Sequence, residues 1–489
     1  MADSIAAPHQ TELTRPVPPR CWWLKRIAAA VGGLLLATAG LRVWWGYEAE
    51  RRLAACLAAY RAAGEPIAVE NLAVPPAPDE ENGALYLQRA ARRIKKPAEL
   101  TQREYEHVYD YDYWPASADA LRQVVRANAE ALALVRQARE QTRANWGYQL
   151  VSPTVRMMGS NPGDAHSVAR LAIAAARCAH ADGNDDAAVA YLRDVLGVGR
   201  HMRELEPRVW GYHAQQGVLD SAIDEVQRLA FELRVRGASE PAAPGSAAHA
   251  AVRELIADLL AEQPLRAAWV RAADGERLMA LEYARLMNSP SGIFTIYGPR
   301  RGWARRTALQ AEAVLLGPAH TLDALATLAE WTRIARAGVA ADYQTARAQR
   351  GHEFWQYEPP AWALGILPHH AGPGVYADLR GHFRALARRR LAATALAVRL
   401  FELDHGVRPT ELGDLVPDYL PTVPTDPFDP QTAALRYAPD RLPPAVYSVG
   451  ENGRDDGGDS GRPNTVAGDE VFMLDELPPP RPRPWPPGY

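Results

Sequence analysis

The sequence predicts a mainly α-helical protein that has an N-terminal transmembrane helix, an irregular helical-hairpin domain and a C-terminal α+β module with a small antiparallel sheet. Three observations favour this fold class. Apolar residues recur at helical spacing through most of the chain, between breaks made by proline and glycine. One uncharged stretch near the N-terminus is long enough to cross a bilayer. Three short strand candidates follow one another near the C-terminus.

Length, charge and cysteine content limit the possible functions. The 489 residues are enough for two or three domains with a sizeable core. The formal net charge is only -3 and 23% of the residues are charged, so no global field indicates nucleic acid or an acidic substrate as a partner. The three cysteines, Cys21, Cys56 and Cys178, are widely spaced and odd in number, which indicates neither a disulfide framework nor a zinc site.

The first predicted element is a transmembrane helix over residues 22–46, preceded by a short cytoplasmic tail, residues 1–21. No charged residue occurs from Ile27 to Leu41, and tryptophan pairs flank this stretch at positions 22–23 and 44–45. As a helix, the segment between the pairs spans roughly 31 Å, close to the ~30 Å hydrocarbon core of a bilayer, with the indoles at both interfaces. The pattern favours an uncleaved anchor that associates the protein with a membrane.

Two features of this segment leave alternatives open. The small residues Ala37–Ala39 resemble a cleavage site, so a cleaved signal peptide is the alternative to an anchor. Basic residues are only slightly more frequent before the span than after it. The positive-inside rule therefore favours a cytoplasmic N-terminus only slightly.

Residues 47–385 are predicted to form helical hairpins. The best example lies at 167–202, where apolar residues line one face of each of two helices and Gly183 with Asn184 makes the turn. The spacing of Gly183, Ala188 and Leu192 resembles the middle of a tetratricopeptide repeat, but no second copy follows at a fixed period. We therefore expect irregular hairpins rather than a regular solenoid.

The sequence carries no specific catalytic motif. It has no H-E-x-x-H, G-x-S-x-G or P-loop pattern and no glycine fingerprint after a strand, so we predict no catalytic residue and expect a non-catalytic protein. Two aromatic loops rich in glycine and proline, at 290–305 and 351–374, could line a groove, although packing over helix ends is the commoner outcome. The alternative function is an envelope-associated hydrolase with its site in these loops, around Trp303 and His369.

The character of the sequence changes in the C-terminal module, residues 386–476. Apolar side chains at Ala393, Leu396 and Leu400 mark one face of a helix that ends where Gly406 can adopt a left-handed conformation. Prolines then hold an extended segment, and "LRY", "AVYSV" and "EVFML" are typical of short strands. This pattern predicts a helix packed on a small antiparallel sheet. A proline-rich, disordered tail follows at 477–489.

Four pieces of this module follow one another in a characteristic order. They are a "D-x-G-x-x-P" turn at 404–409, the segment "PTDPFD" at 424–429, the run "YSVGENG" at 447–453, and Asp469 shortly before the last strand. In this order they resemble the C-terminal region of the major pseudopilin of bacterial type II secretion systems. The resemblance covers the module only. It implies an α+β fold and an extracytoplasmic setting.

In the pseudopilin family the loop between the last two strands holds calcium, so the resemblance implies a calcium site here. Calcium prefers about six to eight oxygen ligands, which carboxylates and main-chain carbonyls of a glycine-rich loop can supply. The alternative is a solvated acidic turn without a metal. The candidate ligands are Asn452, Asp455, Asp456, Asp459 and Asp469.

The chain also departs from the pseudopilin pattern. It lacks the prepilin cleavage site, and a long helical domain separates the span from the module. We therefore expect a borrowed domain rather than a pilus subunit. Together these inferences predict a single-pass protein of the inner membrane, its C-terminal bulk extracytoplasmic, that acts as a scaffold or interaction protein in envelope or secretion assembly with unidentified protein partners.

Overall fold

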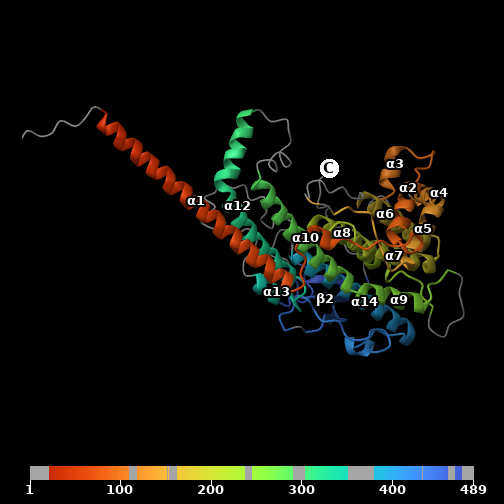
Figure 1. Ribbon diagram of the computed structural model, residues 1–489. Helices are drawn as coiled ribbons and strands as arrows, with labels where there is room; N and C mark the ends of the chain where they lie inside the picture. The colour runs from red at the N-terminus through yellow and green to blue at the C-terminus, as the bar shows by residue number, and fades with distance from the viewer. Residues whose placement is uncertain are drawn as a thin grey trace, which may run out of the picture.

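The structure of the protein is a computed structural model that describes residues 21–109, 118–150, 152, 162–236, 245–289, 303–350, 379–431, 433–460 and 468–475. These residues are mostly helical, with one three-stranded antiparallel sheet near the C-terminus, so the predicted fold class is confirmed (Figure 1). The helices are α1 (Trp22–Ala62), α2 (Gly83–Arg93), α3 (Gln102–His107), α4 (Ala118–Ala127), α5 (Ala129–Glu140), α6 (Pro162–Ala181), α7 (Asp185–Met202), α8 (Val209–Leu229), α9 (His249–Leu260), α10 (Gln263–Met287), α12 (Trp303–Ala337), α13 (Tyr343–Arg350) and α14 (Leu379–His405). The strands are β1 (Arg436–Ala438), β2 (Ala445–Ser448) and β3 (Glu470–Met473).

The longest described helix, α1, runs without a break from the apolar N-terminal segment into the body of the protein. Its apolar window is fully exposed, and α1 is the one helix in the described ranges that is long and apolar enough to cross a membrane. Figure 1 shows α1 projecting from the body, with its C-terminal half beside α12. The helix ends just before Gly64, whose φ of 72° is the left-handed conformation that favours glycine.

Contacts between α1 and α12 join the apolar segment to the body. Arg42 Nε donates a hydrogen bond to the Val314 carbonyl at 2.8 Å. Trp45 packs against buried Ala319, and further along α1 the side chain of Leu53 lies in a buried cluster with residues of α10 and α12. The C-terminal half of α1 is therefore fixed on the body rather than tethered by a loop.

The predicted hairpin at 167–202 is formed by α6 and α7. Gly183 turns the chain with a φ of 81°, and Asn184 caps α7 by accepting a hydrogen bond from the backbone N–H of Ala187 at 3.1 Å. The apolar positions of both helices are buried, which confirms the hairpin prediction. They are Val168, Leu171, Ala175, Cys178, Ala188, Leu192 and Val195.

The central element of the body is α14, and most of its residues are buried. It carries three consecutive arginines, each with different partners. Arg388 pairs with two aspartates of α8, Arg389 donates to main-chain carbonyls at the end of α9, and Arg390 pairs with Glu262 just before α10. These contacts link α14 to three other helices.

The C-terminal sheet has the strand order β1-β2-β3, packs on α14 and shares one hydrophobic core with the helices. In its antiparallel register Val446 lies opposite Phe472. Asp426, from the "PTDPFD" segment, is buried beside β2 and accepts a hydrogen bond from Ser448 Oγ at 2.6 Å. The predicted helix and sheet are confirmed, and the helix, α14, begins at Leu379.

Close packing at Gly275 of α10 generates a test of the core. A Cβ at this position would lie 1.4 Å from the Pro207 carbonyl oxygen, so the two backbones would have to separate. We expect Gly275→Ala to lower the free energy of unfolding by about 1–3 kcal/mol or more, measured by denaturant unfolding of the full chain in detergent. The control is Gly217→Ala on α8, where the nearest atom lies at 3.8 Å and alanine should be neutral or stabilise by up to about 1 kcal/mol. Equal effects of the two substitutions would contradict the packing.

Two buried histidines predict that acid destabilises the fold. His382 Nε2 donates to the Gly338 carbonyl at 2.9 Å, so its Nδ1 accepts from the Tyr212 hydroxyl at 2.6 Å and the ring is neutral. Burial lowers the pKa of His382 to about 3 and that of His201 to about 4. As the pH falls, the unfolded chain binds these protons before the folded chain does. The stabilisation from the neutral, buried rings is therefore complete above about pH 6.5 and is lost as the pH falls toward the pKa values of the folded state.

We therefore expect the unfolding temperature to be lower at pH 5 than at pH 7.5, by thermal melts in matched buffers. His382→Gln should lower stability at both pH values but shrink the difference between them. The control is His405→Gln, which replaces an exposed histidine. An unchanged pH difference in His382→Gln would show that this histidine does not carry the effect.

Candidate functional site

The acidic loop, residues 450–469, contains the predicted calcium ligands, and the structure describes it except for residues 461–467. The Asp469 carboxylate accepts hydrogen bonds from the backbone N–H groups of Gly458 at 2.7 Å and Asp456 at 3.1 Å. The Asp456 carboxylate in turn accepts from the Asn452 amide at 2.7 Å, and Asp455 accepts from the Tyr447 hydroxyl at 3.0 Å. The loop thus closes through its own hydrogen bonds.

Glycine geometry brings the two ends of the loop together. Gly450 has a φ of 64°, and a Cβ there would lie 2.3 Å from the carbonyl oxygen of Gly468. The Asp459 carbonyl accepts a hydrogen bond from the Asp469 N–H at 2.9 Å. A larger residue at position 450 would push the two ends of the loop apart.

The electrostatics of the loop centre on Asp469. Burial raises the pKa of Asp469 to about 6, and the carboxylates of Asp456 and Asp455 act in the same direction, against the two backbone N–H donors. Across the residues that the structure describes, no three carboxylate, imidazole or thiol side chains converge as a metal-binding group. The carboxylates of Asp455, Asp456 and Asp469 already accept hydrogen bonds from protein N–H and O–H groups, and calcium binding stays a prediction.

The loops of the alternative hydrolase lie outside the described residues, except for positions 303–305, whose backbone begins α12. The same holds for His369 and for the proline-rich tail. The structure does describe a second candidate site, which the sequence did not predict.

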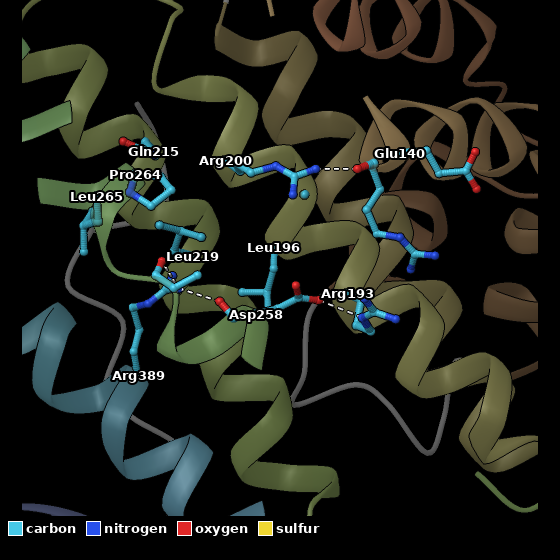
Figure 2. Close-up of a pocket in the computed structure, with 13 residues that line it drawn as sticks. Glu140, Arg193, Leu196, Arg200, Gln215, Leu219, Asp258, Pro264, Leu265 and Arg389 are labelled. Atoms are coloured by element: carbon cyan, nitrogen blue, oxygen red, sulfur yellow. Dashed lines mark hydrogen bonds and ion pairs between the residues drawn. The ribbon is translucent and has the colours of Figure 1, made fainter. Parts of the chain in front are cut away.

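This second site is the arginine pocket, a cavity of about 290 Å³ enclosed by α5, α7, α8, α14 and the junction of α9 with α10 (Figure 2). Its walls combine guanidinium groups with leucine side chains. In the view of Figure 2, Leu196 and Leu219 lie between Arg200 and Arg389. The lining residues are Arg139, Glu140, Arg193, Leu196, Gly197, Arg200, Gln215, Leu219, Asp258, Ala261, Pro264, Leu265 and Arg389.

One face of α7 supplies two of the arginines. Arg193 and Arg200 are separated by two helical turns, with Gly197 between them. Gly197 lets α5 approach, because a Cβ there would lie 3.0 Å from Arg139 Cγ. Arg193 Nε pairs with the Asp258 carboxylate at 2.7 Å.

Arg139 and Arg193 form ion pairs with carboxylates that lie behind the pocket wall. Arg139 Nη1 lies 2.9 Å from the buried carboxylate of Asp194, which also pairs with Arg136. Arg193 pairs with Glu254 in addition to its other carboxylate. These two arginines are therefore neutralised by the protein.

The other two arginines meet main-chain oxygens instead of carboxylates. Arg389 is buried and donates to the carbonyls of Leu259 at 2.9 Å, Asp258 at 2.8 Å and Ala261 at 3.0 Å, where the end of α9 leaves carbonyls without helical partners. Arg200 donates to the carbonyls of Arg139 and Gln141. Among the described residues, neither guanidinium pairs with a carboxylate.

Neighbouring cations disfavour the charge of Arg200, whereas the carboxylates of Glu262, Asp258 and Asp220 raise the pKa of Arg389 against the effect of its burial. Burial is the largest influence that lowers the pKa of Arg389 and of Arg200. The guanidinium groups of Arg139, Arg203 and Arg193 also lower the pKa of Arg200, and Asp258 opposes them. The pocket is thus a place where an added negative charge would be stabilised.

Gln215 of α8 adds an unsatisfied acceptor. Its side chain is 1% exposed and its Nε2 donates to the Gly199 carbonyl at 2.9 Å. Its Oε1 is buried and has no hydrogen-bond partner in the part of the chain that the structure describes. Because buried polar groups are normally hydrogen-bonded, this oxygen indicates a missing donor.

Comparisons with protein-family models, with curated proteins and with solved structures find no match for this chain. The pseudopilin resemblance therefore stays a prediction. The arginine pocket left one signal in the sequence, the spacing of Arg193, Gly197 and Arg200 on one helical face. Its other members come from distant segments and form no motif.

Proposed function

We propose that this protein is a single-span protein of the inner membrane that holds its helical body on the extracytoplasmic side and acts there as a non-catalytic scaffold or interaction protein in envelope or secretion assembly. The observation that supports it is the continuity of α1. The exposed apolar half of this helix and the half that packs on α12 belong to one element. A body fixed to its span in this way is held close to the bilayer surface, where its helices can meet envelope partners.

The flanks of the exposed half of α1 suit an interface. Trp23 and Trp44 are 68% and 62% exposed, as expected for indoles that lie at lipid headgroups. Arg42, near the C-terminal indoles, donates from its Nε to the Val314 carbonyl, so α12 packs against α1 at this level. The alternative, a cleaved signal peptide, would remove the apolar half and free the body.

Membrane fractionation tests the anchor. We expect the full chain to stay in the membrane pellet after alkaline extraction and to keep its N-terminus by mass spectrometry. The double substitution Leu34→Arg/Leu36→Arg places two charges in the apolar window, each costing about 2.5–3.5 kcal/mol at the centre of a span, and should release the protein or block insertion. The control is Leu442→Arg on the body, where the leucine is 92% exposed, and it should leave the pellet unchanged. A soluble chain that starts near position 40 would overturn the anchor.

Labelling tests the orientation, which is supported by the slight excess of basic residues before the span and by the pseudopilin resemblance. In spheroplasts, a membrane-impermeant maleimide should label Arg454→Cys in the exposed acidic loop but not Cys21 in the predicted cytoplasmic tail. The reverse labelling would place the body in the cytoplasm and would remove the envelope role.

Calcium binding by the acidic loop is the second part of the proposal. It is supported by the resemblance and by the carboxylates gathered near Asp469. Extracellular calcium modules bind at roughly 0.1–1 mM, and a hundredfold excess of calcium over the dissociation constant would stabilise the fold by about 2.7 kcal/mol. We therefore expect calcium, but not an equal concentration of magnesium, to raise the unfolding temperature of the full chain.

The substitution that tests this site is Asp469→Asn, compared with Asp440→Asn in an exposed turn. Asp469→Asn also weakens the acceptor of two loop N–H groups, so it should lower stability by about 1 kcal/mol without any metal. The increment that calcium adds separates the two effects: it should vanish in Asp469→Asn and persist in Asp440→Asn. A calcium increment of zero in the unsubstituted protein would leave the loop as an acidic turn.

A further inference from the structure

We infer that the arginine pocket binds a small organic anion, whose phosphate or carboxylate group is held by Arg200 and Arg389 and whose adjacent hydroxyl group donates to Gln215. This site does not depend on the membrane role proposed above. Three independent features of the pocket support it: its charge, its unsatisfied acceptor and its shape.

The net charge of the site favours an anion even when the ion pairs within the protein are counted. Five arginines and four carboxylates surround the cavity when the pairs behind its wall are included. Asp194 is shared by two arginines, and Arg193 holds two carboxylates. The sum over these groups is one positive charge, and Arg200 and Arg389 are the two arginines among them whose partners are main-chain carbonyls.

Arg200 has the free donors that an anion requires. Its Nη2 donates to two main-chain carbonyls, whereas its Nε and Nη1 make no hydrogen bond within the described ranges. The planar arrangement of these N–H groups matches two oxygens of a phosphate or carboxylate. Arg389 is held in one orientation by three carbonyls, so it contributes a fixed charge to the pocket wall.

Gln215 limits the ligand to one that also carries a donor. Inorganic ions without an O–H or N–H group would leave its buried Oε1 without a partner. A hydroxyl group beside the anionic group would satisfy this oxygen and would therefore strengthen binding. The amide is held in place by its own bond to the Gly199 carbonyl, so the acceptor is positioned before the ligand arrives.

The shape of the pocket limits the size of the ligand. A cavity of about 290 Å³ lies at the lower end of the range for small-molecule sites, which is about 300–1,000 Å³. The buried leucines Leu196, Leu219 and Leu265 offer a short apolar wall for a carbon skeleton. A molecule of three or four carbons suits these walls better than a nucleotide or a peptide. Glu140 and Asp258, the two lining carboxylates, would repel a second anionic group placed beside them.

Calorimetric titration of the full chain in detergent, at constant ionic strength, tests the site with two matched pairs of probes. Glycerol 3-phosphate is compared with propyl phosphate, and lactate with propionate; the second member of each pair lacks the hydroxyl groups on carbon and each probe carries one anionic group. We expect the hydroxylated member of at least one pair to bind about tenfold more tightly than its partner. The pair that binds identifies the anionic group as phosphate or carboxylate.

Two substitutions separate the roles of the pocket residues. Arg200→Gln should weaken binding of the better probe about tenfold or more, as expected for a charge-assisted hydrogen bond, whereas Arg92→Gln on the exposed face of α2 should leave it unchanged. Gln215→Met keeps the side-chain volume and should abolish the preference for the hydroxylated probe. Thermal melts confirm that each variant is folded. Absence of binding by all four probes, or equal binding by Arg200→Gln and Arg92→Gln, would overturn the inference.

Discussion

Three consecutive arginines of α14, two of them buried and the third half-buried, determine how this protein is assembled. Burying a charge costs several kcal/mol unless it is paired and hydrogen-bonded, and α14 buries Arg388 and carries Arg389 and Arg390 directly after it. Each must meet its own partners, which lie on α8, at the end of α9 and before α10. A shift of α14 by one residue would exchange these partners and leave charges unpaired. The arginines therefore set the position of α14 among the helices, and with it that of the sheet packed on α14.

The need of a buried guanidinium group for hydrogen-bond partners also connects the arginine pocket to the fold. Arg389 satisfies carbonyls at the end of α9 and, from the same position, forms part of the pocket wall. The opposite side of the body is joined through buried His382 of α14, which accepts from Tyr212 of α8 and donates to Gly338 just after α12. Because α12 also packs on α1, the apolar helix is connected through α12 to the core that carries the pocket. A binding site on such a core would be held rigidly with respect to the membrane.

Local patterns in the sequence predicted individual helices and strands, but they could not predict which residues far apart in the sequence pair with one another. Helical spacing found the α6–α7 hairpin, and uncharged length found the apolar half of α1, because burial or lipid contact imposes a period on neighbouring residues. The triplet at 388–390 gives no such signal, since a run of arginines is usually solvated and its partners lie more than a hundred residues away in the sequence. The arginine pocket was missed for the same reason. Gln215 could not be recognised at all, because an unsatisfied oxygen is defined only by its surroundings.

The two candidate sites differ in how far the protein satisfies its own polar groups. In the acidic loop, Asp469, Asp456 and Asp455 each accept a hydrogen bond from a protein donor, and the loop closes without help. In the arginine pocket, the buried Oε1 of Gln215 has no partner among the described residues, whereas exposed Arg200 uses only its Nη2, on two main-chain carbonyls. A buried acceptor without a donor is costly, and a polar group that is already hydrogen-bonded gains little from a ligand. On this physical ground the structure favours the pocket over the loop as the place where a ligand would be recognised, even though the sequence pointed to the loop.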